Sequence, residues 1–447
     1  MTDRLPGGVR PGYALGSLAA GAFNTVPGLL LLPYLTDTLG ITAAAAGLLI
    51  LLPKAWDVLL NPVVGRLSDR TRTRWGARRP YLLFGGLGLA VCFAAMFAGP
   101  IRHGGGAAGY VTVMFLLAAT AFAFFQVPYV AMPAEMTDDH TERTRVMTWR
   151  IALLAVAILV SGAVAPVLVT AGGSGMAGHR LMGGVIATVI AVGAVGAFLG
   201  TRRAPLGTVS LAEPSFRRQL RVARRNRPFL VLVTVFVVQT VGIATMLAGV
   251  KYLADHVLNS PDDGPTLLFA CFVGPALIVM PMWTKLGDRW GKNRALATAS
   301  ILMAVAAVAM LVAWWAPAVA VYPVTAIMGV GYAGQQVFAL AMLPDCIAQD
   351  AARTGRRQAG VFTGLWTAGE TLGLALGPGV FSLVLALGGY VSSGTGTAAA
   401  QTDAARIAIL IGFTVVPALL IGPVTLLLRR YGHTEADPAP VHRKTVR

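Results

Sequence analysis

The stretch GRLSDRTRTRWGARR, residues 65–79, is rich in arginine and lies between two long apolar segments. A shorter version, KLGDRWGKNR, occupies residues 285–294, about half a chain further on, and it too lies between apolar segments. Short basic connections between apolar segments are typical of proteins whose helices cross a membrane. The recurrence of the pattern predicts that the chain is built from two related halves.

The composition agrees with a membrane protein. Of the 447 residues, 56% are hydrophobic and only 12% are charged, which is too little polar surface to cover a water-soluble globule of this size. Most apolar runs reach the roughly 20 residues that a helix needs to cross a bilayer. We therefore expect an all-α membrane protein, and we exclude a soluble enzyme with a single anchor. The twelve expected spanning helices lie near residues 12–36, 43–65, 81–100, 110–134, 148–170, 181–200, 228–253, 265–284, 295–314, 317–343, 359–388 and 405–428.

The basic residues are distributed to one side of these spans, although the net charge of +17 by itself is also compatible with nucleic-acid binding. If the N-terminus is cytoplasmic, nearly all Lys and Arg residues fall on the cytoplasmic side. The exceptions are Lys54 within the second span and Arg102, Arg180, Lys251 and Arg406 near external ends. The positive-inside rule then predicts that both termini are cytoplasmic, and no nucleic-acid partner is expected.

The longest basic connection divides the chain. We expect a six-helix half at residues 1–200, a basic cytoplasmic linker at 201–227, a second six-helix half at 228–429 and a cytoplasmic tail at 430–447. Two repeated halves with a site at their interface are the design of alternating-access transporters. The sequence therefore predicts a transport protein that rocks two halves about a site near the middle of the membrane.

The two basic loops resemble the cytoplasmic loop signature of the major facilitator superfamily. PAEMTDDHTERTR at 133–145 is loosely matched by PDCIAQDAARTGRR at 344–357 as a second repeated pair. Acids at such helix ends are expected to hold the opposite half through charge-assisted bonds that break on rocking. The expected gating residues are Gly65, Asp69, Arg70, Gly76, Arg78, Arg79, Glu135, Arg143, Asp288, Arg289 and Asp345.

Longer strings narrow the resemblance. KAWDVLLNPVVGRLSDRTRTRWGARRPYLLFG at 54–85 and QVPYVAMPAEMTDDHTERTRVMTWR at 126–150 are similar to the glycoside-pentoside-hexuronide:cation symporter (melibiose permease-like) family of that superfamily. The resemblance covers nearly the whole chain. It implies the major facilitator fold of twelve helices and uptake of a sugar driven by sodium, lithium or protons. It also implies a multi-pass protein of the bacterial cytoplasmic membrane.

The resemblance further implies a cation site in the second span. It places an aromatic residue and a cation-site carboxylate at Trp56 and Asp57, with a basic residue at Lys54. The family commonly has a second acid where this chain has Asn61. Relatives also carry charge at the positions of Gln126 and Thr371, the latter directly after Glu370, and an acid at the position of Gly21.

Asp57 lies far from either end of its span, where an unpaired carboxylate costs on the order of 3 kcal/mol. Lys54 shares its helix face, so a purely structural ion pair is one interpretation, and a coupling site is the other. Sodium requires several oxygen ligands, whereas a proton requires one carboxylate whose pKa is raised. The reduced set of charges favours a proton. The expected coupling residues are Asp57, Lys54, Asn61, Gln126 and Glu370.

Amide and aromatic side chains within the spans are candidates to bind sugar hydroxyls and ring faces. The alternative for each of them is that it holds neighbouring helices together. The expected solute-binding residues are Asn24, Thr25, Trp56, Gln126, Tyr129, Trp149, Arg150, Gln239, Gln335, Gln336, Trp366 and Thr371.

The sequence thus predicts a secondary active transporter, a monomer in the lipid bilayer, whose partners are a small solute and a co-transported cation, more readily a proton than sodium. One alternative is an exporter or flippase of an amphipathic lipid-like compound or natural product, because the pathway has lost family charges. Another is a transport-dead sensor or scaffold. No catalytic arrangement, metal site or cofactor motif is recognised, so we expect neither an enzyme nor a bound cofactor.

Overall fold

The computed structural model describes residues 5–99, 105–137, 139–205, 224–354, 359–393 and 399–432. Within these ranges the secondary structure is helical, which confirms the predicted all-α class. The helices are α1 Val9–Ala14, α2 Gly16–Pro33, η1 Tyr34–Thr38, α3 Ala43–Arg70, α4 Arg79–Ala98, α5 Gly105–Ala131, α6 Pro133–Met136, α7 His140–Ala171, α8 Gly175–Gly200, α10 Arg227–Tyr252, η2 Leu253–Val257, α11 Gly264–Trp290, α12 Lys292–Ala309, η3 Met310–Trp314, α13 Ala318–Thr354, α14 Ala359–Leu387, α15 Asp403–Phe413, α16 Val415–Ile421 and α17 Val424–Gly432.

Twelve helical segments of the described chain are long and apolar enough to cross a membrane, as the sequence predicts. The first of them, Val9–Thr38, joins α1, α2 and η1, and the seventh, Arg227–Val257, joins α10 and η2. Both η1 and η2 are short π-helices that end their spans, and such π turns are frequent at functional sites. The two spans therefore share a local distortion at equivalent places.

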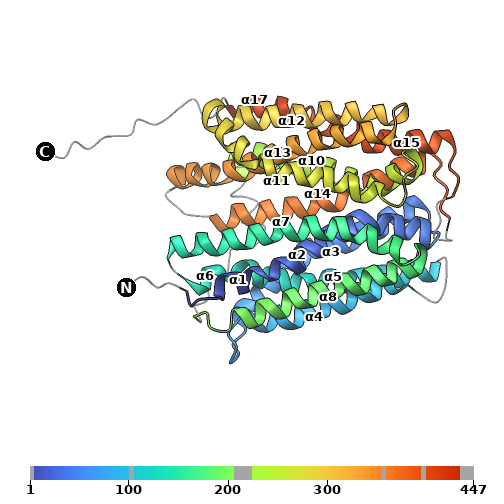
Figure 1. The fold of residues 1–447 in the computed structure, drawn as a ribbon. Helices are drawn as coiled ribbons and strands as arrows, with labels where there is room; N and C mark the ends of the chain where they lie inside the picture. Colours follow the sequence, from blue (N-terminus) through green and yellow to red (C-terminus); the bar gives the residue numbers. More distant parts are fainter. Residues whose placement is uncertain are drawn as a thin grey trace.

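The helices lie side by side and form two groups (Figure 1). We call α1 to α8 the N-terminal half and α10 to α17 the C-terminal half. Because the number of spans is even, α1 begins and α17 ends at the same end of the bundle, on the left in Figure 1. We call this end proximal and the opposite end distal.

Packing within each half is closer than packing between the halves. In the N-terminal half, α4 packs on α5 and α8, and in the C-terminal half α10 packs on α14 while α13 packs on α11 and α12. The halves meet along three helix pairs, α3 with α14, α7 with α11 and α2 with α10. These pairs place the second span, which carries Asp57, directly at the interface between the halves.

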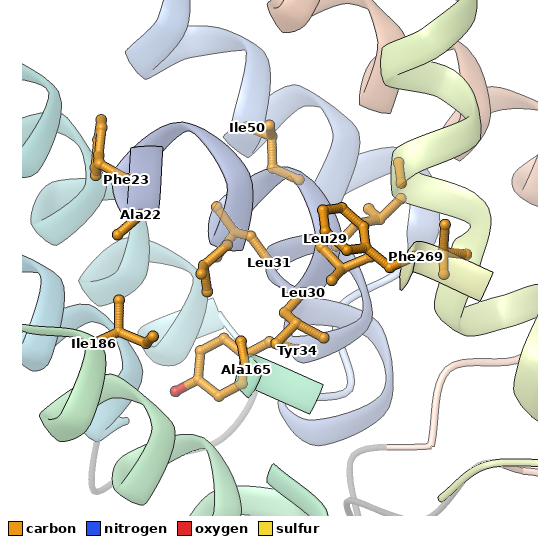
Figure 2. Close-up of a cluster of buried hydrophobic side chains, with 14 of the residues drawn as sticks. Ala22, Phe23, Leu29, Leu30, Leu31, Tyr34, Ile50, Ala165, Ile186 and Phe269 are labelled. Atoms are coloured by element: carbon orange, nitrogen blue, oxygen red, sulfur yellow. The ribbon is translucent and has the colours of Figure 1, made fainter. Parts of the chain in front are cut away.

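The core near that interface is apolar and aromatic. Figure 2 shows Leu29, Leu30 and Leu31 of α2 among side chains of α3, α7, α8 and α11, so this cluster includes residues of both halves. Phe23 of α2 packs on Phe122 of α5 with ring centroids 4.6 Å apart. Because lipid tails are as apolar as leucine, the gain here comes from close van der Waals packing of the helices.

Close helix approach depends on glycine where α1 crosses α8. A Cβ atom added to Gly12 would lie 2.5 Å from the Cα of Gly200. That atom belongs to the backbone and has no rotamer by which to move away.

We expect the Gly12→Ala variant to lose about 1–3 kcal/mol of stability, because α1 must move away from α8. The matched control is Gly109→Ala in α5, where an added Cβ meets nothing within 4 Å and alanine is the better helix former. Thermal unfolding of both variants in detergent checks this. Equal melting temperatures for the two variants would contradict the proposed α1–α8 contact.

Candidate functional site

Asp57 lies in the middle of α3 and is only 5% exposed. Its Oδ1 atom is buried and has no hydrogen-bond partner. Carboxylates buried in this way are costly unless they are paired or protonated. The structure therefore places the predicted coupling carboxylate in an environment that disfavours its charge.

Lys54 does not neutralise Asp57 by direct contact. Its ammonium group lies 5.4 Å from the centroid of the Phe23 ring of α2, in a cation–π arrangement. No ion pair of 4 Å or less joins Lys54 to Asp57, although both side chains are described. The interpretation of these two residues as a structural ion pair therefore has no direct contact to support it.

The other predicted coupling residues lie on three helices. Asn61, one turn after Asp57 on α3, is half-buried, and so is Gln126 of α5, whose Oε1 atom is buried without a partner. Glu370 of α14 is exposed and lies near enough to Arg150 of α7 to interact with it electrostatically. Arg150 and Glu370 belong to opposite halves. No ion pair of 4 Å or less joins them in the described part of the structure, so Arg150 acts on Glu370 only at longer range across the interface.

Arg150 is held in place by aromatic and hydroxyl groups. Its guanidinium lies 5.4 Å from the centroid of the Tyr129 ring, and its backbone carbonyl accepts a hydrogen bond from the Ser17 hydroxyl at 2.9 Å. The Tyr129 hydroxyl lies 3.0 Å from the Ser17 hydroxyl and donates to the Tyr13 carbonyl at 3.0 Å. The Arg150 Nε atom has no partner, so part of the guanidinium is available for another group.

Glu370 has a second neighbour on its own half. It interacts electrostatically with Tyr332 of α13, whose hydroxyl accepts a hydrogen bond of 2.9 Å from the Gln336 side chain. The structure thus brings Tyr129, Arg150, Gln336 and Glu370, which the sequence predicts as site residues, together with Tyr332, which it does not.

The remaining predicted solute-binding residues occupy different environments. Trp56 is 42% exposed and donates to the Thr120 hydroxyl at 3.0 Å, and Trp149 is 51% exposed. Trp366 is 4% exposed and stacks on Phe236 with centroids 4.0 Å apart, inside the C-terminal half. These three aromatic residues therefore do not form one binding surface.

The polar residues predicted to bind solute also lie in different environments. Gln239 joins α10 to α12 through a 2.9 Å bond to Ser300. Gln335 of α13 is 2% exposed and neither polar atom of its side chain has a partner. Thr371 donates to the Thr367 carbonyl one turn before it on α14. Thr25 is buried and Asn24 is half-buried on α2.

The predicted gating residues at the proximal end of the N-terminal half form a compact cluster. Arg78 donates to the Glu135 carboxylate at 2.7 Å and to the Ser68 hydroxyl at 2.6 Å. Arg79 donates to the Ala204 carbonyl at 2.6 Å. Gly76 has a φ of 94°, which favours glycine, and it shares with Arg78, Arg79 and Glu135 the lining of a hollow of about 60 Å³.

The matching loop of the C-terminal half is more open. Lys292 donates to the Asp345 carboxylate at 2.6 Å, and both side chains are 44% exposed. Asp288 and Arg289 are exposed, as is Arg70 in the N-terminal half. Both loop pairs therefore lie within their own half, and gating bonds between the halves stay a prediction for another state of the protein.

Three further proximal residues complete the predicted gate. Arg143 donates to the Thr137 carbonyl at 3.0 Å, and a Cβ atom added to Gly65 would lie 3.7 Å from the Val127 side chain, an ordinary contact distance. The side chain of Asp69 lies outside the described part of the structure.

The sequence analysis did not identify a second proximal cluster, which links α1 to α7. Arg10 donates to the Glu142 carboxylate at 2.6, 2.8 and 3.0 Å, and Arg145 donates to it at 2.8 Å. Burial acts to raise the pKa of Glu142, but these hydrogen bonds dominate and hold it below its usual value. The cluster is therefore ionised near neutral pH.

The halves are joined at the distal end by hydrogen bonds from residues that the sequence analysis also did not identify. The Tyr390 hydroxyl donates to the Asp37 carboxylate at 2.7 Å, and the Ser393 hydroxyl donates to the Asp37 carbonyl at 2.8 Å. We call the contact the distal seam, and its residues are Thr36, Asp37 and Ile41 of the N-terminal half with Tyr252, Tyr390, Ser392 and Ser393 of the C-terminal half.

A weak sequence signal marks this seam. YLTDT at 34–38 forms the π-helix η1 and YLADH at 252–256 overlaps the π-helix η2, and the two stretches align about half a chain apart like the basic loops. In that alignment Asp37 corresponds to Asp255. The repeat is too short to be recognised without the loops, but it selects the acid that lies in the seam.

Comparison with known proteins gives matches along nearly the whole chain. The family model described as "MFS/sugar transport protein" matches residues 12–435. The uncharacterized symporter YnaJ of Bacillus subtilis (strain 168) is 28% identical over 420 residues, which cover 92% of this chain and 88% of that protein. The isoprimeverose transporter of Lactiplantibacillus pentosus is 24% identical over 448 residues, covering 98% and 91%.

A solved structure of a bacterial homolog of the human lysosomal transporter Spinster, described as inward-facing and unoccupied, is similar in fold. The TM-score is 0.67 at 14% identity, and the match covers 97% of this chain and 98% of that one. At this identity the likeness concerns the fold alone.

The proximal loops give a direct test of how burial changes an ion pair. We expect Glu135→Gln to cost up to about 3 kcal/mol, because it removes the Glu135 carboxylate from the buried Arg78 guanidinium. The control, Asp345→Asn, removes an exposed pair and is expected to cost less than about 1 kcal/mol. Thermal unfolding in detergent measures both, and a larger loss for Asp345→Asn would overturn the assignment.

Proposed function

Because the chain belongs to the MFS/sugar transport protein family, we propose that it is a secondary active transporter that moves a sugar or glycoside together with a proton. Transport would proceed by rocking the two halves about a site between α3, α5, α7, α13 and α14. The observation that carries the proposal is Asp57, a buried carboxyl with an unpartnered oxygen at the interface of the halves.

A proton suits Asp57 better than sodium does. A sodium ion replaces its hydration shell with several oxygen ligands, and the neighbouring candidates for that role are the amide oxygens of Asn61 and Gln126. A proton needs only the carboxyl itself, and binding it removes the cost of burying a charge. The orphaned Oδ1 atom of Asp57 and the position of Lys54 over Phe23 support a carboxyl that is neutral in this state.

We further propose that the proximal end faces the cytoplasm. The proximal loops carry most of the basic residues, as the positive-inside rule requires of cytoplasmic loops. The distal seam joins the halves at the opposite end, while the described loop pairs Arg78–Glu135 and Lys292–Asp345 each stay within one half. This arrangement supports an inward-facing state, in which the solute pathway would open toward the cytoplasm.

The solute would bind between the halves near Arg150 and Glu370. Arg150 acts on Glu370 at longer range across the interface, and Gln336 of α13 and Gln126 of α5 offer amide groups. Amide and charged groups of this kind bind sugar hydroxyls. A sugar that bridges Arg150 and Glu370 would draw the two halves together, which is the step that alternating access requires.

The Asp57→Asn variant tests the coupling. In proteoliposomes with an imposed proton gradient, we expect its solute accumulation to fall to the passive level, because the amide cannot take up a proton. Exchange of labelled for unlabelled solute is expected to persist, because the pathway itself is intact. The control is Asp403→Asn, which alters an acid that is 84% exposed at the distal end.

Uptake that is insensitive to protonophore but lost on removal of sodium would contradict proton coupling. The solute class is tested in the same vesicles with a panel of glycosides and amphipathic lipids. Stimulated movement of the lipids alone would favour the exporter or flippase, and movement of neither, together with an intact fold, would favour a sensor.

A further inference from the structure

Asp37 is an acid within the distal seam, and nothing in its family membership assigns it a role. It lies in η1 and is only 6% exposed, and its carboxylate accepts the 2.7 Å bond from Tyr390 of the opposite half. No Lys, Arg or His nitrogen lies within 4 Å of its carboxylate in the described part of the structure. The seam therefore closes around a carboxyl without a basic partner.

The equivalent acid of the other half differs in this respect. Asp255 of η2 accepts a 2.6 Å bond from Lys251, one turn earlier, so its charge is balanced within its own helix. The position that corresponds to Lys251 before Asp37 is Pro33, which carries no charge. The two repeats thus place equivalent acids at the distal end, and only Asp37 depends on the opposite half for a partner.

A chain of hydrogen bonds leads to Asp37. The Tyr390 hydroxyl has one hydrogen, which it uses in the hydrogen bond to Asp37. In the 3.1 Å contact between His256 and Tyr390, His256 must therefore be the donor, through Nε2. Burial, reinforced by the nearby Asp37 carboxyl, raises the pKa of Tyr390 far above its usual value, so Tyr390 stays a donor at all physiological pH. The neutral hydroxyl groups of Tyr390 and Thr36 do not replace the hydration shell that an ionised Asp37 has when the seam is open.

We propose that Asp37 is a proton-binding site of the distal gate, which takes up a proton when the seam closes and releases it when the seam opens. The direction of the pH dependence follows from the burial of Asp37 in the closed seam. The closed state holds the proton more tightly than the open state, so closure is favoured at low pH and is lost as the pH rises. The Asp37 proposal rests on the proposed function in one respect only, which is that the two halves rock apart at the distal end.

The other ionisable groups around the seam would not make closure more favourable at low pH. Lys251 forms an ion pair with Asp255, and at longer range its charge also favours an ionised Asp37, but burial of Asp37 outweighs this effect. His256 is 8% exposed, and at low pH its imidazole would gain a proton and a positive charge. Because burying that charge is unfavourable, protonation of His256 would oppose closure at low pH. Arg406 of α15 donates to the His256 carbonyl at 2.8 Å. Tyr252 bonds to Thr36 at 2.7 Å and is uncharged. Protonation of Asp37 therefore favours closure at low pH, whereas protonation of His256 would oppose it.

Distances between spin labels on the two halves measure the gate without using transport. The labels are attached to cysteines at Thr42, which directly precedes α3, and at Leu267 on α11, and both positions are exposed near the distal end. The native cysteines are replaced by serine in this background, and they are Cys92, Cys271 and Cys346. Pulsed electron spin resonance in lipid nanodiscs without solute then gives the fraction of molecules whose halves are separated distally.

We expect the ratio of separated to closed molecules to rise at least about threefold between about pH 5 and pH 8, within the limit of about tenfold per pH unit that one linked proton allows. In Asp37→Asn this pH dependence is expected to disappear, with the seam closed throughout. In His256→Gln, which keeps a donor to Tyr390, the pH dependence is expected to stay.

The proposal is overturned if Asp37→Asn keeps the pH dependence, if the protein with Asp37 intact shows none, or if separation increases toward low pH. All of these measurements are made in an Asp57→Asn background, so that the proposed coupling carboxyl does not contribute to the pH response. The matched control within that background is Asp403→Asn, an acid that is 84% exposed at the distal end, and its labels are expected to retain the pH response. Because no solute is present, failure of proton-coupled uptake and failure of the Asp37 proposal give separate results.

Discussion

The contact between α3 and α14, with its partners α7–α11 and α2–α10, is the interaction on which the rest of the structure depends. It joins two halves that are each packed more closely within themselves, so it is the contact at which the molecule can change shape. At the distal end the contact is completed by a row of hydroxyl, phenol and carboxyl groups. Hydrogen bonds of this kind are specific, but they can be exchanged for bonds to water when the halves separate.

The interface between the halves also explains where the spans carry charge. In a lipid environment an ionisable side chain is retained where another group, a proton or water meets it. Asp57 and Glu370 lie on α3 and α14, which form the main contact between the halves, and Arg150 lies on α7 and attracts Glu370 across it. Asp37 closes the distal end of that interface. We infer that the charges of the spans are placed to respond when the halves move.

Much of the fold follows from local sequence because spans depend on length and hydropathy, which a single chain shows directly. All twelve spans are confirmed, as are the helical class and the family. The site is harder because a side chain's role depends on its neighbours across the interface. Trp366 and Gln239 are polar or aromatic like true site residues, yet they pack against Phe236 and Ser300 within one half. Asp37 was not recognised because its partner, Tyr390, lies more than three hundred residues away in the chain.

The central claim is that the distal seam must open for solute to cross. A cysteine pair at Gly47 of α3 and Ser382 of α14 tests it. A Cβ atom at residue 47 would lie 2.7 Å from that of Ser382, so the two helices need to separate by only about 1 Å to reach the roughly 3.5–4.5 Å of a disulfide. With the disulfide formed in proteoliposomes, we predict that solute exchange stops and that a reductant restores it, while Ser382→Cys alone leaves exchange intact. Exchange that continues with the disulfide in place would contradict the account.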